Sequence, residues 1–335
     1  MYDPSGRDDQ IVVAIVKKTS ISLEDDRKTQ QLSATTLLDL MKSPVFLNVV
    51  PSTMLILANK SLFHNYSWTS AVMLAMLHLL FNCVSFECLR QLNFFDRSHA
   101  VPFSIILKIM FPLAVSDALQ AMSVKLNSLG VFVMLKQLTI PFAALGEYYV
   151  SEPCECFSPL LLVFLAGIIS GVSLLTVHDV SFNFAGSIVG LSAAALNVLG
   201  QFSLNIALKT VDVSPLQLRY ETTVRGGWLL LFSLLIELYL DPLSVNNTPN
   251  LRSNVAFPLL VSCSLAPVVS LSYFFVMKAT SPLTYQVLGP LKLVLSMTAS
   301  FYFFGEDLNV TQAFAICIVM LSLCGYNYVR YYQKS

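Results

Sequence analysis

Apolar residues occupy most of the chain in runs of about 20, and short polar clusters separate one run from the next. An α-helix of that length crosses the hydrocarbon core of a bilayer. The pattern predicts ten spanning helices, preceded by a polar tail over 1–42, in a membrane domain over 43–332. The expected spans are 43–63, 67–89, 101–122, 124–148, 157–178, 182–208, 214–240, 255–278, 281–304 and 309–331.

The composition agrees with this pattern. Of the 335 residues, 55% are hydrophobic and only 12% are charged, and the mean hydropathy is +0.68. Soluble domains carry roughly a quarter of charged residues. The predicted fold class is therefore an all-α polytopic membrane protein.

Basic residues indicate the orientation of the spans. An even number of spans places both termini on one side, and lysines and arginines accumulate on the cytosolic side of a membrane. The side of the termini would hold Lys42, Arg90, Arg97, Lys209, Lys278, Arg330 and Lys334. The opposite side would hold Lys60, Lys125 and Arg252. We therefore expect both termini, and the tail, to be cytosolic.

The fourth and ninth expected spans each contain a lysine in their interior. Lys292 follows Gly289 and Pro290 in the ninth span, and Lys136 lies within the fourth. A lysine at the centre of a spanning helix costs about 2.5–3.5 kcal/mol on insertion, and it normally faces a water-filled cavity. Two interpretations remain open: the lysines hold an anion, most simply a phosphate, or each pairs with an internal carboxylate for structural reasons.

The fourth and ninth spans also resemble each other. When 127–128 is aligned with 280–281, Lys136 falls on Gly289, one helical turn before Lys292. The match predicts two halves of five spans each, of which the second is inverted in the membrane. Inverted repeats are typical of secondary transporters that bind substrate near the bilayer midplane. The expected halves are about 43–178 and 182–332.

Other charged residues lie inside or near the expected spans. Glu221 and Arg225 are spaced i,i+4, which favours an ion pair with a structural or gating role, although Arg225 could instead contact substrate. Arg219 and Tyr220 lie near the cytosolic end of the same span and serve either as ligands or as interfacial anchors. Asp117 is expected to be the partner of a buried lysine, and proton coupling stays open.

Enzyme signatures are missing from the sequence. There is no G-x-S-x-G, P-loop or H-E-x-x-H motif, and we find no nucleophile with a base and no carboxylate pair within one span. Cys154 and Cys156 form a single Cys-x-Cys without a nearby histidine, which is a weak metal signal. We therefore expect a protein that is not an enzyme, uses no cofactor or metal, and binds no nucleic acid.

The ninth-span run 280–289, TSPLTYQVLG, followed by Lys292, resembles a motif of the nucleotide-sugar/triose-phosphate translocators of the drug/metabolite transporter superfamily. Asn127-Ser128, Phe132, Lys136 and Thr139-Pro141 resemble the fourth-helix counterpart, and the resemblance covers about 43–332. It implies ten helices in two inverted halves, and exchange of phosphorylated solutes whose phosphates Lys136 and Lys292 hold. The resemblance adds four motif residues to the candidate substrate contacts: Asn127, Ser128, Tyr285 and Gly289. The other candidate substrate contacts are Lys136, Lys292, Arg219 and Tyr220.

The sequence departs from the family pattern at two places. Tyr220 is followed by Glu221-Thr222, where some nucleotide-sugar members carry two asparagines that contact the base. Leu293 follows Lys292, where the family often has threonine or arginine, and this argues against the plastid triose-phosphate branch. The GDP-mannose motif is matched only at Gly289. These differences leave a UDP-sugar as the preferred substrate class.

The sequence thus predicts an antiporter of the Golgi or endoplasmic reticulum membrane, which exchanges a cytosolic nucleotide sugar for a lumenal nucleoside monophosphate by alternating access. Two alternatives remain: an organic-phosphate/phosphate exchanger, or a non-transporting relative that acts as a scaffold. The sequence does not decide the sugar, the base, the organelle, the oligomeric state (a homodimer is one option), proton coupling or the use of the glycosylation sequons at Asn59, Asn65, Asn246 and Asn309.

Overall fold

The computed structural model describes residues 43–65, 71–95, 101–127, 129–150, 158–176, 183–240, 253–304 and 309–334. The predicted tail over 1–42 lies outside these ranges. The chain divides into two units at Leu47, and the packing described below belongs to the unit that begins at Asn48.

The described residues are helical and contain no strand, which confirms the all-α class. The helices are α2 Pro44–Asn65, α3 Ala71–Gln91, α4 Phe103–Leu126, α5 Leu129–Gln137, α6 Thr139–Val150, α7 Pro159–Thr176, α8 Phe184–Thr210, α9 Pro215–Leu240, α11 Ser253–Ala279, α12 Pro282–Phe304 and α13 Val310–Lys334.

Six segments of the described helices are long and apolar enough to cross a membrane. They are Pro44–Phe63, Met73–Gln91, Phe103–Ser123, Phe184–Thr210, Val255–Ala279 and Val310–Arg330, and Pro159–Leu175 is a shorter apolar helix. Within the described residues, α9 and α12 are not among these segments. The chain is therefore a multi-pass membrane protein with polar side chains on some of its helices.

The predicted fourth span is divided into α5 and α6 at Leu138. Pro141 has no backbone N–H to donate to the carbonyl of Gln137, so the helix cannot continue regularly across this point. The Leu138 N–H donates instead to the Leu135 carbonyl at 3.1 Å, and the Thr139 hydroxyl donates to the Lys136 carbonyl at 2.8 Å. The break therefore lies two residues after Lys136.

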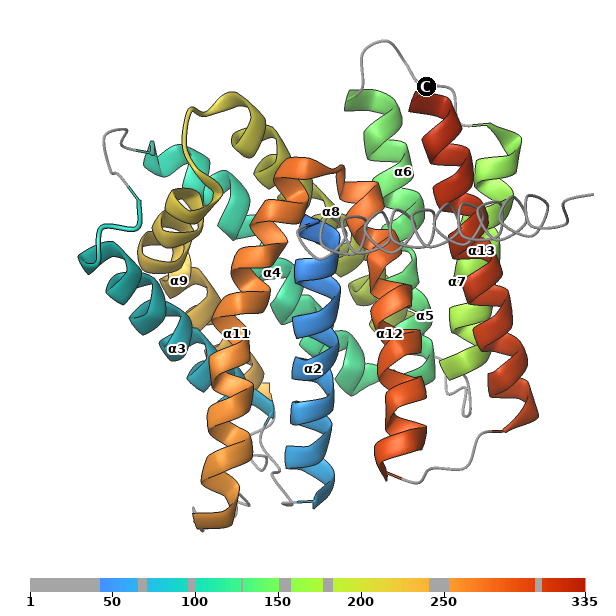
Figure 1. Cartoon of the computed structure of the whole chain (residues 1–335), viewed down its shortest axis with the longest axis horizontal. Coiled ribbons are helices and arrows are strands. Elements are labelled where there is room, and N and C mark those ends of the chain that lie inside the picture. Colours follow the sequence, from blue (N-terminus) through green and yellow to red (C-terminus); the bar gives the residue numbers. More distant parts are fainter. Residues whose placement is uncertain are drawn as a thin grey trace, which may run out of the picture. The chain divides into compact units, whose positions relative to one another are not determined.

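α8 joins two apolar clusters. Val198 and Phe202 belong to a cluster with buried residues of α6, α7, α12 and α13. Leu204, Ala207 and Leu208 belong to another with residues of α4, α9 and α11. α7 and α13 lie side by side in the first group (Figure 1). Polar residues on α8 can therefore meet side chains from both groups.

Small residues allow α4 to pack closely against α9 as well as α8. A Cβ built on Gly226 of α9 would lie 2.6 Å from Met110 Cγ, whereas one on Gly227 would lie 3.9 Å from Leu79 Cδ1, an ordinary contact. The two neighbouring glycines therefore provide a matched pair for testing this packing.

We expect Gly226→Ala to be less stable than Gly227→Ala by about 1–3 kcal/mol, because only the first overpacks the helix interface. Both changes gain about the same helix propensity, roughly 1 kcal/mol, so the difference reports the packing. Thermal unfolding of the two variants in detergent measures it, and equal midpoints would contradict the close approach of α4 and α9.

Candidate functional site

Polar side chains from five helices surround a cavity of about 260 Å³. Its polar lining consists of Asp117 from α4, Asn197 and Gln201 from α8, Arg219 from α9, Tyr273 from α11 and Tyr285 from α12. Its apolar lining consists of Ile109, Met110, Leu113 and Phe274. A cation, a carboxylate, two amides and two phenols thus face one space inside a membrane protein, where such groups mark a functional site.

A second, much smaller cavity of about 30 Å³ lies beside Lys136. Gln120, Thr139, Asn197 and Gln286 contribute its other polar groups. Asn197 lines both cavities, so the two are neighbours along α8. Lys136 lies in the last turn of α5 and is the cation of this smaller cavity.

Arg219 brings a third cation to this region. Its guanidinium carbon lies 5.6 Å from the centre of the Phe86 ring and 5.3 Å from the centre of the Phe274 ring, within the range of cation–π attraction. Its Nε is buried and has no hydrogen-bond partner among the described residues. Arg219 lies in the second turn of α9, whose start is well defined. Pro215 occupies the first helical position, and the Ser214 hydroxyl accepts from the Gln217 N–H at 3.0 Å.

One face of α12 carries Tyr285, Gly289 and Lys292, which are spaced i, i+4 and i+7. Lys292 Nζ lies 5.0 Å from the centre of the Tyr285 ring, and the Tyr285 ring lies 4.7 Å from that of Tyr273. A Cβ built on Gly289 would meet no atom within 4 Å. The open space beside Gly289 therefore adjoins a cation and an aromatic pair.

Four side chains form a hydrogen-bonded chain between α6, α12 and α8. The Thr139 hydroxyl lies 3.1 Å from Gln286 Oε1, and Gln286 Nε2 donates to Gln201 Oε1 at 2.9 Å. Gln201 Nε2 in turn donates to Asn197 Oδ1 at 2.8 Å. Asn197, Gln201 and Gln286 were not among the sequence candidates, although the i,i+4 spacing of the first two on an apolar helix was a signal for one polar face.

Several of the sequence candidates lie away from both cavities. The Tyr220 hydroxyl donates to Glu87 Oε2 at 3.1 Å, and Asn127 Oδ1 accepts from the Asn183 N–H at 3.0 Å. Ser128 lies outside the described residues. Glu221 and Arg225 form an ion pair of 3.1 Å, and Arg225 also donates to a backbone carbonyl of the segment before α4.

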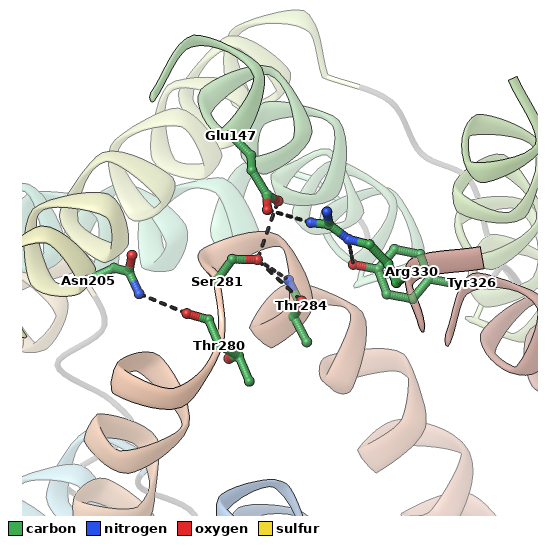
Figure 2. A network of polar contacts seen from close by, with 7 residues as sticks. All are labelled: Glu147, Asn205, Thr280, Ser281, Thr284, Tyr326 and Arg330. Carbon is green, nitrogen blue, oxygen red and sulfur yellow. Dashed lines mark hydrogen bonds and ion pairs between the residues drawn. The ribbon is translucent and has the colours of Figure 1, made fainter. Parts of the chain in front are cut away.

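A buried ion pair joins α6 and α13 at another place (Figure 2). Arg330 Nη2 lies 2.5 Å from Glu147 Oε1, and both side chains are 11% exposed. Arg330 Nε donates to the Tyr326 hydroxyl at 3.4 Å. The sequence analysis placed Arg330 only among the basic residues near the membrane surface, because nothing in the sequence links positions 183 residues apart.

The same carboxylate reaches the start of α12. The Ser281 hydroxyl donates to Glu147 Oε2 at 3.3 Å and accepts from the Thr284 N–H at 3.3 Å, which makes Ser281 the N-cap of the helix that carries Lys292. Asn205 of α8 donates to the carbonyls of Met277 and Thr280 just before this helix. The network shown in Figure 2 therefore anchors the beginning of α12.

The family described as the Triose-phosphate Transporter family matches residues 147–327. UDP-xylose transporter 1 of Arabidopsis thaliana is 29% identical over 85% of this chain and 82% of its own length. UDP-rhamnose/UDP-galactose transporter 1 of Arabidopsis thaliana is 24% identical over 86% of this chain and 83% of its own length.

One solved crystal structure of another protein is similar in fold. It matches with a TM-score of 0.64 at 12% sequence identity and covers 85% of this chain and 96% of the other. At that identity the likeness concerns the arrangement of helices alone.

Proposed function

Because the chain belongs to the Triose-phosphate Transporter family, within the drug/metabolite transporter superfamily, we propose that it is a nucleotide-sugar antiporter. It exchanges a cytosolic nucleotide sugar for a lumenal nucleoside monophosphate across the Golgi or endoplasmic reticulum membrane. UDP-sugars are its preferred class, in line with the relatives that are named as UDP-xylose and UDP-rhamnose/UDP-galactose transporters.

The observation that carries this proposal is the combination of cations, aromatic rings and amides around two neighbouring cavities. Arg219 and Lys136 each line one cavity, and Lys292 lies against Tyr285, which lines the larger one. A nucleotide sugar offers matching chemistry, since a diphosphate seeks cations, a base stacks on aromatic rings, and a sugar seeks hydrogen-bonding partners. Arginine suits planar recognition of a phosphate, and the lysines act as point charges.

The size of the cavity supports alternating access. Ligand sites usually measure about 300–1,000 Å³, and the larger cavity here measures about 260 Å³. The site therefore has to widen before it admits a whole nucleotide sugar, so entry requires movement of the surrounding helices.

Helix contacts support two inverted halves. If α2–α7 form one half and α8–α13 the other, with α5 and α6 counted as one span, then α3 and α9, α6 and α12, and α7 and α13 are equivalent pairs. Each of these pairs packs together, as helices near a shared two-fold axis would do. The excess of basic residues on the side of the termini supports a cytosolic position for both termini.

Counterflow in reconstituted vesicles tests the proposal. We expect vesicles preloaded with UMP to take up labelled UDP-sugar at least about tenfold faster than empty vesicles, because exchange requires a ligand on both sides of the membrane. GMP-loaded vesicles and boiled protein are the controls.

Two other outcomes would replace the proposal. Counterflow of triose phosphate or phosphoenolpyruvate, without nucleotide-dependent uptake, would indicate an organic-phosphate exchanger, for which the family description is the supporting observation. Absence of counterflow with every one of these solutes would indicate a non-transporting scaffold.

A further inference from the structure

The amides beside the cavities form a hydrogen-bonded chain from Gln286 through Gln201 to Asn197. Gln286 Nε2 donates to Gln201 Oε1 at 2.9 Å, and Gln201 Nε2 donates to Asn197 Oδ1 at 2.8 Å. Gln286 Nε2 also lies 3.4 Å from Asn197 Oδ1. A carboxamide oxygen has two lone pairs, so both acceptor positions of Asn197 are engaged by the two glutamines.

The other end of the Asn197 amide is an NH₂ group, which can only donate. Its nitrogen has no acceptor among the hydrogen bonds of the described residues. Asn197 lines both the larger cavity, beside Tyr273 and Tyr285, and the smaller cavity, beside Lys136. The chain of amides therefore holds a hydrogen-bond donor between an aromatic wall and a cation.

This position fits the base of the bound nucleotide. With the phosphates near the cations, a base can stack against the aromatic pair Tyr273 and Tyr285, whose ring centres are 4.7 Å apart. Asn197 lines the same cavity as these two rings, so it is placed for contact with a base that stacks there. Uracil carries a carbonyl acceptor at C4, whereas cytosine carries an amino donor at the same place.

We propose that Asn197, oriented by Gln201 and Gln286, determines base specificity by donating a hydrogen bond to the C4 carbonyl of uracil. The assignment rests on the proposed nucleotide-sugar function, which it makes more specific. Opposite a cytosine, the same NH₂ group would face another donor, and both groups would be left unpaired in a site with little water. The geometry therefore selects uridine nucleotides over cytidine nucleotides.

The decisive experiment compares UMP and CMP as counter-substrates for the full-length chain in vesicles. We expect the wild type to prefer UMP by about tenfold or more, the factor that one unpaired donor produces. In Asn197→Asp the carboxylate offers a second acceptor, so the ratio of UMP to CMP should fall by about tenfold or invert, even if total uptake declines. Asn183→Asp is the matched control: Asn183 is the N-cap of the same helix, where aspartate serves equally well, and its ratio should stay at the wild-type value.

A measurement on the ligand keeps the proposal testable if Asn197→Asp does not fold. The wild-type chain should bind 4-thio-UMP, which keeps N3–H and has sulfur, a weaker acceptor, in place of the C4 oxygen, about tenfold more weakly than UMP. Equal binding of analogue and UMP, or an unchanged UMP-to-CMP ratio in a folded Asn197→Asp, would refute the role of Asn197 while leaving the antiporter in place. If the wild type exchanges neither UMP nor CMP, the proposed function itself fails.

Discussion

Lys292→Ala is expected to lower UDP-sugar counterflow about 100-fold. Removing the ammonium deletes a charge-assisted contact to the phosphate, and such contacts contribute about 1.5–3 kcal/mol each. Lys292 lies against Tyr285, on the face of α12 that also carries Gly289. Because Tyr285 lines the larger cavity, the Lys292 side chain is next to that cavity. The initial rate of uptake in UMP-loaded vesicles measures the loss.

Two variants distinguish a phosphate contact from a structural role. Lys292→Arg keeps the charge and should retain more uptake than Lys292→Ala, although the guanidinium is not an equivalent of the ammonium. Lys209→Ala removes a lysine from the exposed last turn of α8 and should leave uptake unchanged. If Lys292→Ala transports as well as Lys209→Ala does, Lys292 does not bind substrate.

The sequence predicted the helices well, because hydropathy reports directly on the cost of leaving polar groups in lipid. It also contained the signal for the division of the fourth span, since Pro141 cannot donate a backbone hydrogen bond and the break falls three residues earlier, at Leu138. The predicted span nevertheless ran through this point. A run of apolar residues identifies a crossing, and it does not require the helix to be continuous.

The polar site could be predicted only in part. Arg219 and Tyr220 are neighbours on α9, but they point in different directions: Arg219 lines the cavity, while the Tyr220 hydroxyl bonds to Glu87 of α3. Which of two adjacent residues faces the interior depends on how the helix is rotated, and that rotation is set by packing. A lysine is conspicuous in the sequence of an apolar span. Asn197 and Gln201 are uncharged and therefore less conspicuous, although both line the larger cavity.

Arg330→Met is expected to lower the free energy of unfolding by about 3–5 kcal/mol, because it leaves the Glu147 carboxylate buried without its cation. The two side chains are 11% exposed and only 2.5 Å apart, so water can replace little of the lost interaction. Ser281 would still donate to Glu147, but one neutral hydroxyl does not balance a charge in this setting. Thermal unfolding in detergent, with the protein at fixed concentration, measures the change.

Glu147→Leu combined with Arg330→Met should recover most of this stability, because replacing a buried ion pair with apolar residues is often neutral. The single variants should therefore both be less stable than the double variant, and the coupling between them should exceed about 2 kcal/mol. The pair Glu87 and Arg90 of α3 provides the contrast, since its side chains are 37% and 34% exposed and the same cycle there should give a clearly smaller coupling. If the two cycles give equal coupling, Glu147 and Arg330 do not form a desolvated pair in the membrane. The start of α12 would then be anchored by Ser281 and Asn205 alone.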